Sequence, residues 1–144
     1  MSEYMDRESK QYIKELITLG TPHSSNSTID QTRGLLSYIN DRYPGSYEPT
    51  IRYKSVIAAG ISGKFSFNLL QLVAYLSYYA LAGRGATRGD GIIPLEASKL
   101  NGAKNIVIQE EVLHSNYIPT PFQSVKLGNV KWYGDAEVLK EIML

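Results

Sequence analysis

The sequence predicts an α/β domain with about three parallel strands and flanking helices. Short apolar runs rich in β-branched residues alternate along the chain with longer stretches of helical periodicity. Each of the first two runs ends at a glycine. Strands that alternate with helices favour a parallel sheet with right-handed crossovers. The 144 residues suffice for one domain at most.

The first strand is expected within Ile13–Gly20, where leucine and isoleucine form the apolar run of a buried parallel strand. A loop rich in Pro and Ser follows over 21–27. Apolar residues at helical spacing then predict a helix from about Ile29 to Tyr43, with Ser27 or Thr28 as its cap.

The second strand is expected within Ile51–Gly60, whose last residues are all small or β-branched. A helix that is apolar nearly all round is expected over Asn68–Leu81, ending at Gly83 and Gly85. A glycine-dense loop follows. We interpret the segment 66–88 as a helical insertion between the second strand and this loop.

The last third of the chain contains a short helical turn, Leu95–Leu100, and a third strand, Asn105–Ile108. An amphipathic helix over Asp135–Leu144, with Asp135 as cap, is expected to close the domain. Trp132 and Tyr133 are expected to anchor that helix. Three strands alone would leave two open edges and a marginal core.

Composition excludes several classes of protein. A net charge of +1 with scattered Lys and Arg gives no reason to expect a nucleic-acid partner. The absence of cysteine excludes disulfides, thiolate zinc sites and a cysteine nucleophile. The charged N-terminus does not resemble a signal peptide, and we expect a soluble protein.

The longest apolar stretch, Phe65–Gly83, is near membrane-spanning length but is interrupted by Ser66, Asn68, Gln71 and Ser77. We therefore expect a buried or lid-like helix instead of a membrane span. Its Tyr and Leu content leaves peripheral contact with a lipid surface open.

Candidate chemistry lies beyond the carboxyl ends of the strands, where α/β sheets place their sites. Asp90 stands between two glycines beyond the second strand and the helical insertion, and His114 follows the third strand. Although 24 positions apart, the two side chains are expected to meet. An imidazole of this kind accepts the proton of a nucleophilic hydroxyl, and a carboxylate fixes its tautomer.

The segments LGTPHSS, GDGIIPLEASKLNGAKNI and VLHS, in this order and spacing, resemble the second half of lipase- and esterase-like α/β-hydrolases. The resemblance is to the plant and cyanobacterial branch related to GPI inositol-deacylases and triacylglycerol lipases, and covers 13–114. It implies that the chain is the C-terminal portion of an α/β-hydrolase fold, a single partial domain over 1–144. It also implies that Asp90 is the triad acid and His114 the triad base, with no cofactor or metal.

The nucleophile elbow of that family, G-x-S-x-G, does not occur in this chain. The nearest match, around Ser62, has its second glycine one position early and stands in the wrong chain order. A turn role for Ser62 is favoured, as are loop or cap roles for Ser24 and Ser25. His23 is expected to hydrogen-bond the loop that carries it, with contact to a substrate pocket as the alternative.

The resulting functional hypothesis is the C-terminal half of a serine-type ester hydrolase acting on an ester or lipid-like small molecule. Because the nucleophile would lie outside this chain, the isolated polypeptide is expected to be inactive. The 66–88 insertion would be core, a lid or a pocket wall.

The alternatives are a non-catalytic interaction module, whose exposed first strand pairs with another chain, and a gene fragment without independent activity. The exposed first strand is also expected to lead to self-association. The family resemblance implies a cytoplasmic or plastid protein, but the sequence leaves the compartment open.

Overall fold

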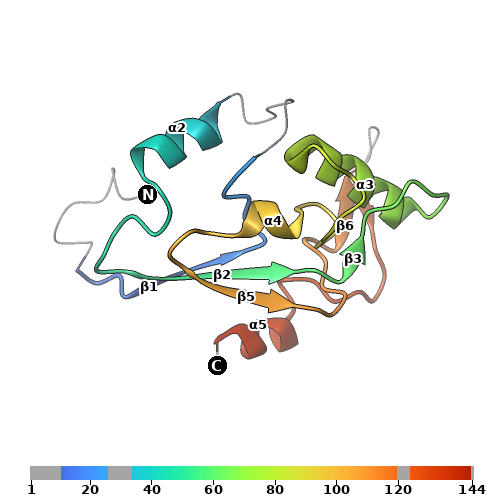
Figure 1. Ribbon diagram of the computed structural model, residues 1–144. Helices are drawn as coiled ribbons and strands as arrows, with labels where there is room; N and C mark the ends of the chain where they lie inside the picture. Colours follow the sequence, from blue (N-terminus) through green and yellow to red (C-terminus); the bar gives the residue numbers. More distant parts are fainter. Residues whose placement is uncertain (1–10, 26–33, 120–123, 144) are drawn as a thin grey trace.

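A three-stranded parallel sheet forms the centre of the molecule (Figure 1). The computed structural model describes residues 11–25, 34–119 and 124–143. Strands β1 (Glu15–Leu19), β2 (Arg52–Ala58) and β5 (Lys104–Ile108) pair in the order β1-β2-β5. The predicted α/β class and the three predicted parallel strands are therefore confirmed.

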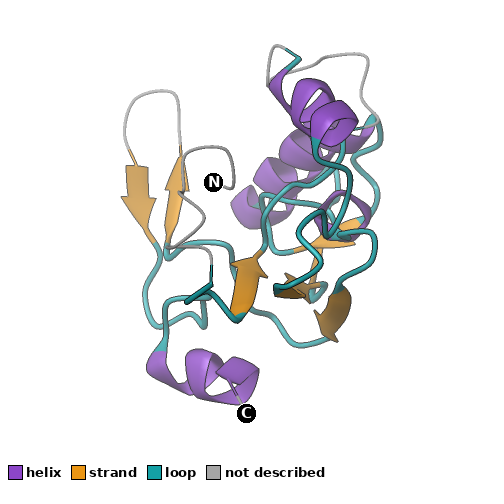
Figure 2. Ribbon diagram, turned by 90° about the vertical axis from the view of Figure 1, so that its left-hand side faces the viewer, coloured by secondary structure: helices purple, strands orange, loops and turns teal. Residues whose placement is uncertain are grey.

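Helices cover both faces of this sheet. In both views α2 (Leu35–Arg42), α3 (Leu69–Ala82) and α4 (Leu95–Ser98) lie on one side, and α5 (Ala136–Met143) lies on the other (Figures 1 and 2). Four predicted helical segments correspond to these elements. The ends of α3 follow the expected signals, since the Asn68 side chain accepts a hydrogen bond from the Gln71 amide and Gly83 ends the helix with a φ of 72°.

One boundary differs from the predictions. The helix expected from Ile29 begins at Leu35 in the described chain, after Gly34 with a left-handed φ of 83°. The expected caps Ser27 and Thr28 lie outside the described residues. Asp135 precedes α5 as expected, and its carboxylate accepts a hydrogen bond from the Trp132 amide.

The sequence analysis missed two short antiparallel pairs. β3 (Ile61–Ser62) pairs with β4 (Arg88–Gly89), and β6 (Tyr117–Pro119) pairs with β7 (Ser124–Lys126). Strands of two or three residues carry too little alternation for a periodicity argument. β3 precedes and β4 follows the helical segment that contains α3. Their pairing therefore brings the two ends of that segment together.

The core has two clusters that meet near the carboxyl ends of the strands. Alternate residues of β2, Val56 and Ala58, pack with α5 and Tyr133 on one face of the sheet. The second cluster joins Tyr78 of α3 to Ile61 and Leu113 beyond the sheet.

The prediction that β1 is a buried strand is wrong, because all five of its residues are only half-buried. β1 is an edge strand and pairs with β2 alone within the described sheet. The apolar helix α3 is likewise buried only at Ala74 and Tyr78. Other apolar side chains on α3 and on the loop before it are exposed: Phe65, Phe67, Leu69, Leu76 and Tyr79. Within the described residues, no helix has the length and apolar character needed to cross a membrane.

Candidate functional site

Asp90 stands in a tight turn directly after β4, and only 1% of it is exposed. One of its carboxylate oxygens, Oδ1, accepts hydrogen bonds from the amides of Ile92 (3.0 Å) and Ile93 (2.7 Å). The Asp90 amide in turn donates to the Ile93 carbonyl. Gly91 supplies the left-handed residue of the turn, with a φ of 95°. These hydrogen bonds fix the orientation of the carboxylate. They leave its other oxygen, Oδ2, available to a different partner.

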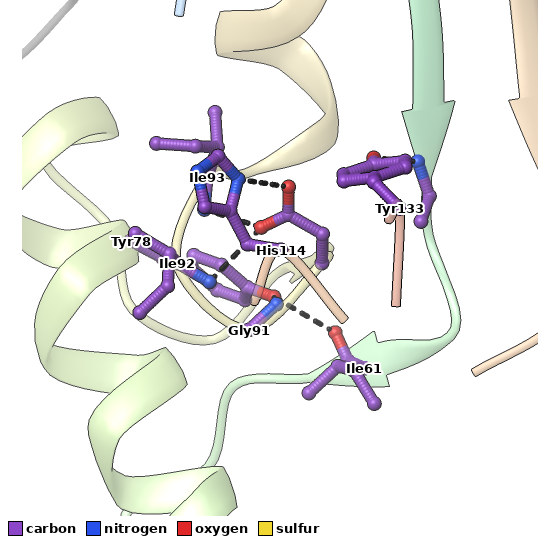
Figure 3. A network of polar contacts seen from close by, with 9 residues as sticks. Ile61, Tyr78, Gly91, Ile92, Ile93, His114 and Tyr133 are labelled. Atoms are coloured by element: carbon purple, nitrogen blue, oxygen red, sulfur yellow. Dashed lines mark hydrogen bonds and ion pairs between the residues drawn. The ribbon is translucent and has the colours of Figure 1, made fainter. Parts of the chain in front are cut away.

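Tyr78 fastens this turn to the body of the domain (Figure 3). Its buried hydroxyl donates to the Ile61 carbonyl (3.2 Å) and accepts from the Gly91 amide (2.8 Å). Burial raises the pKa of the Tyr78 phenol, so the hydroxyl stays neutral and keeps its proton for Ile61. Helix α3 thus holds the turn that carries Asp90.

His114 meets Asp90 from the segment that follows β5. The His114 amide donates to the Asp90 carbonyl at 2.9 Å, and the ring atom Nδ1 lies 2.9 Å from Oδ2 of Asp90. The sequence prediction that these two residues converge is therefore met by the geometry. The Asp90 carboxylate now has both oxygens engaged, one by backbone amides and one by the imidazole.

The hydrogen bond between the His114 ring and the Asp90 carboxylate raises the pKa of His114, while burial of the ring opposes that shift. The imidazole side chain remains 35% exposed, in contrast to its partner. No other described residue hydrogen-bonds the second ring nitrogen, Nε2. The ring is therefore oriented from one side by a buried carboxylate and open to a reactant on the other.

Two residues that the sequence analysis did not assign to the site complete its surroundings. Gly20, at the end of β1, approaches so closely that a Cβ at this position would overlap Oδ2 of Asp90 and the Tyr133 ring. Tyr133 presents an edge-on contact to the His114 ring, with 6.1 Å between centroids. The position of Gly20 directly after the first strand could have indicated its place in the site. No local sequence pattern indicates that Tyr133 belongs to the site.

A shallow recess lies beside His114, with a volume of about 10 Å³. That volume holds about one water molecule, so a substrate would lie over the recess and not inside it. Its lining is mainly apolar and comes from α3, from the His114 segment and from the β6–β7 region: Leu70, Val73, Leu113, Ile118 and Leu127.

The other candidate residues lie elsewhere. His23 Nε2 is 3.1 Å from the Thr18 hydroxyl, and burial lowers the pKa of His23. Ser25 donates to the Leu81 carbonyl, and Ser62 is exposed in β3. Among the described residues, no serine hydroxyl hydrogen-bonds the His114 ring. The same part of the chain contains no group of three or more side chains suited to hold a metal ion.

Comparison of this chain with protein-family models, with curated proteins and with solved structures returned no match. The geometry of the site and the sequence motifs are therefore the basis for assigning a function.

Proposed function

We propose that this chain supplies the acid and the base of a serine-type ester hydrolase of the α/β-hydrolase fold. The observation that carries the proposal is the 2.9 Å contact between a fully buried carboxylate and Nδ1 of a half-exposed imidazole. Asp90 and His114 reach each other from beyond two neighbouring parallel strands, β2 and β5. This is the edge of the sheet at which α/β proteins place their sites.

Each member of the pair has a distinct task. Asp90 holds His114 in the tautomer with its proton on Nδ1, which leaves Nε2 as the acceptor. Nε2 takes the proton of a hydroxyl as that oxygen attacks an ester carbonyl, and later returns it to the departing alcohol. Asp90 stabilises the imidazolium that exists between these two steps.

The attacking serine would come from sequence outside this chain and approach Nε2 from the exposed side of the ring. The apolar lining of the recess beside His114 favours a lipid-like acyl group over a charged substrate. On this proposal α3, through Leu70 and Val73, forms one wall of the substrate site.

We expect the 144-residue polypeptide alone to have negligible esterase activity. Loss of a triad member lowers turnover by up to about a million-fold. The assay is hydrolysis of a short-chain p-nitrophenyl ester, with the His114→Ala variant as control. Turnover well above that control would contradict the assignment of the nucleophile to another segment.

The proposal itself is tested on the coding sequence upstream of Met1. We expect an in-frame G-x-S-x-G segment within roughly a hundred codons, as the order of parts in these enzymes requires. The longer protein should be labelled at that serine by a fluorophosphonate ester, and His114→Gln should abolish labelling. Equal labelling of wild type and His114→Gln would refute the role of the pair.

A second candidate, an interaction module, is favoured by the open outer edge of β1 and by the exposed apolar side chains around α3. On this proposal the chain associates with itself through β1. Sedimentation at increasing concentration should then show dimers or larger species. A clean monomer at micromolar concentration would contradict it.

A further inference from the structure

Tyr133 is held by two hydrogen bonds of its own, and the segment around it by a third. Its hydroxyl accepts a hydrogen bond of 2.7 Å from the Ala58 amide, at the last residue of β2. Its own amide donates to the Leu113 carbonyl at 3.1 Å, and the Leu113 amide donates to the Lys131 carbonyl at 2.9 Å. The segment around Tyr133 therefore forms a parallel bridge with the residue that directly precedes His114.

These anchors place the Tyr133 ring against the candidate site (Figure 3). The ring meets His114 edge to face, with an interplanar angle of 86°, and only 4% of the tyrosine is exposed. Burial and the nearby carboxylate of Asp90 raise the pKa of the phenol, so its hydroxyl is neutral. Gly20 packs so closely against the Tyr133 ring and Oδ2 of Asp90 that it leaves no room for a Cβ atom.

An imidazole joined to its carboxylate by one hydrogen bond can still turn about its χ angles. The Nδ1–Oδ2 bond fixes one direction of the ring, and a second contact is needed to fix its plane. The Tyr133 ring supplies that contact, and its hydroxyl ties the ring to the sheet. The sheet, the His114 segment and the imidazole plane are therefore coupled through one side chain.

We infer that Tyr133 is a positioning residue that holds His114 in register with Asp90 by its ring contact and its hydroxyl anchor at Ala58. The catalytic meaning of this role rests on the proposed function, but the positioning can be measured without activity. Tyr133 is assigned no contact with substrate.

The experiment is an NMR titration of the imidazole resonances in the full chain. His114 and His23 are the only histidines, so a His23→Gln variant assigns the signals. Removing the ring by Tyr133→Leu should lower the measured His114 pKa by about one unit, as the hydrogen bond to the carboxylate loses its geometry. Tyr133→Phe keeps the ring but loses the hydroxyl, which is tied to Ala58 and also interacts with the Asp90 carboxylate, so it should change this pKa by a smaller amount.

Two further variants separate the outcomes. Val138→Ala truncates a buried member of the same core cluster, so it should destabilise the fold and leave the His114 pKa unchanged. Asp90→Asn should lower the His114 pKa by removing the carboxylate charge. If Asp90→Asn has no effect, the proposed function fails. If it lowers the pKa while a folded Tyr133→Phe or Tyr133→Leu titrates as the wild type, the positioning role alone is overturned. Should Tyr133→Leu fail to fold, Tyr133→Phe decides.

Discussion

Replacing Gly20 by alanine tests the packing around the Asp90–His114 pair directly. Gly20 ends β1 with a left-handed φ of 55°, and its amide donates to the Val56 carbonyl at 2.9 Å. An added Cβ would overlap Oδ2 of Asp90 and would lie 2.6 Å from Cε2 of Tyr133. Neither neighbour can retreat cheaply, because the carboxylate holds two backbone amides and the tyrosine holds the end of β2.

The expected cost has two parts. A non-glycine residue in the left-handed region costs about 1–2 kcal/mol. Forcing a methyl group into a filled site adds about 1–3 kcal/mol, because side chains leave their preferred rotamers or the backbone moves. We therefore expect Gly20→Ala to lower the free energy of unfolding by about 2–5 kcal/mol, a large share of the stability of a small domain.

The assay is urea unfolding followed by the fluorescence of Trp132, the only tryptophan. With a mid-range slope of about 2 kcal/mol per molar urea, the midpoint should fall by about 1–2.5 M. Two other glycines calibrate the result. Gly128→Ala meets no atom within 4 Å and should change stability by less than about 0.5 kcal/mol. Gly91→Ala has a φ of 95° but meets only movable leucine side chains, so it measures backbone strain with little overlap.

A Gly20→Ala protein as stable as Gly128→Ala would refute the packing argument. A loss equal to that of Gly91→Ala would mean that the overlap with Asp90 and Tyr133 costs nothing. The His114 pKa in Gly20→Ala should also fall, since displacement of Oδ2 weakens its bond to Nδ1.

The remaining predictions concern the hydrogen bonds of the same site. Because the folded pKa of His114 is raised, its pairing stabilises the fold fully below the unfolded value of 6.5 and is lost as pH rises through the folded pKa. The stability difference between wild type and His114→Gln should therefore shrink from pH 5.5 to pH 8.5, and a constant difference in urea unfolding would contradict the raised pKa. Tyr78→Phe should cost about 1–3 kcal/mol, because the buried Gly91 amide loses its acceptor and the Ile61 carbonyl loses the hydroxyl. The neighbouring Tyr79→Phe, on a half-exposed side chain, should cost little, and equal losses in thermal or urea unfolding would contradict the role given to the Tyr78 hydroxyl.

Local patterns predicted most of the secondary structure. The apolar run before Gly20, the end of the second strand and the third strand each lie where the sheet has a strand, because side-chain burial imposes a pattern readable within a few residues. Asn68 and Gly83 likewise marked the ends of α3. The two antiparallel pairs were missed because their strands are too short to show a period.

Part of the candidate site could also be predicted from local sequence patterns. Asp90 and His114 were found because each lies beyond a strand in a motif of glycines or small residues. The roles of Tyr133 and Tyr78 could not be predicted from the sequence. Tyr133 bonds to Ala58, and Tyr78 bonds to Ile61 and Gly91, and no spacing rule links these positions.

The sequence by itself therefore determined the α/β class, the order of the helices and of the three strands of the parallel sheet, and which two side chains form the candidate pair. The tertiary structure alone decided that Nδ1 of His114 faces Oδ2 of Asp90, and that a glycine from β1 and a tyrosine from near α5 enclose them. The reason is physical. Strand and helix signals depend on neighbours in the chain, whereas an oriented imidazole depends on contacts between segments that only the packed sheet brings together.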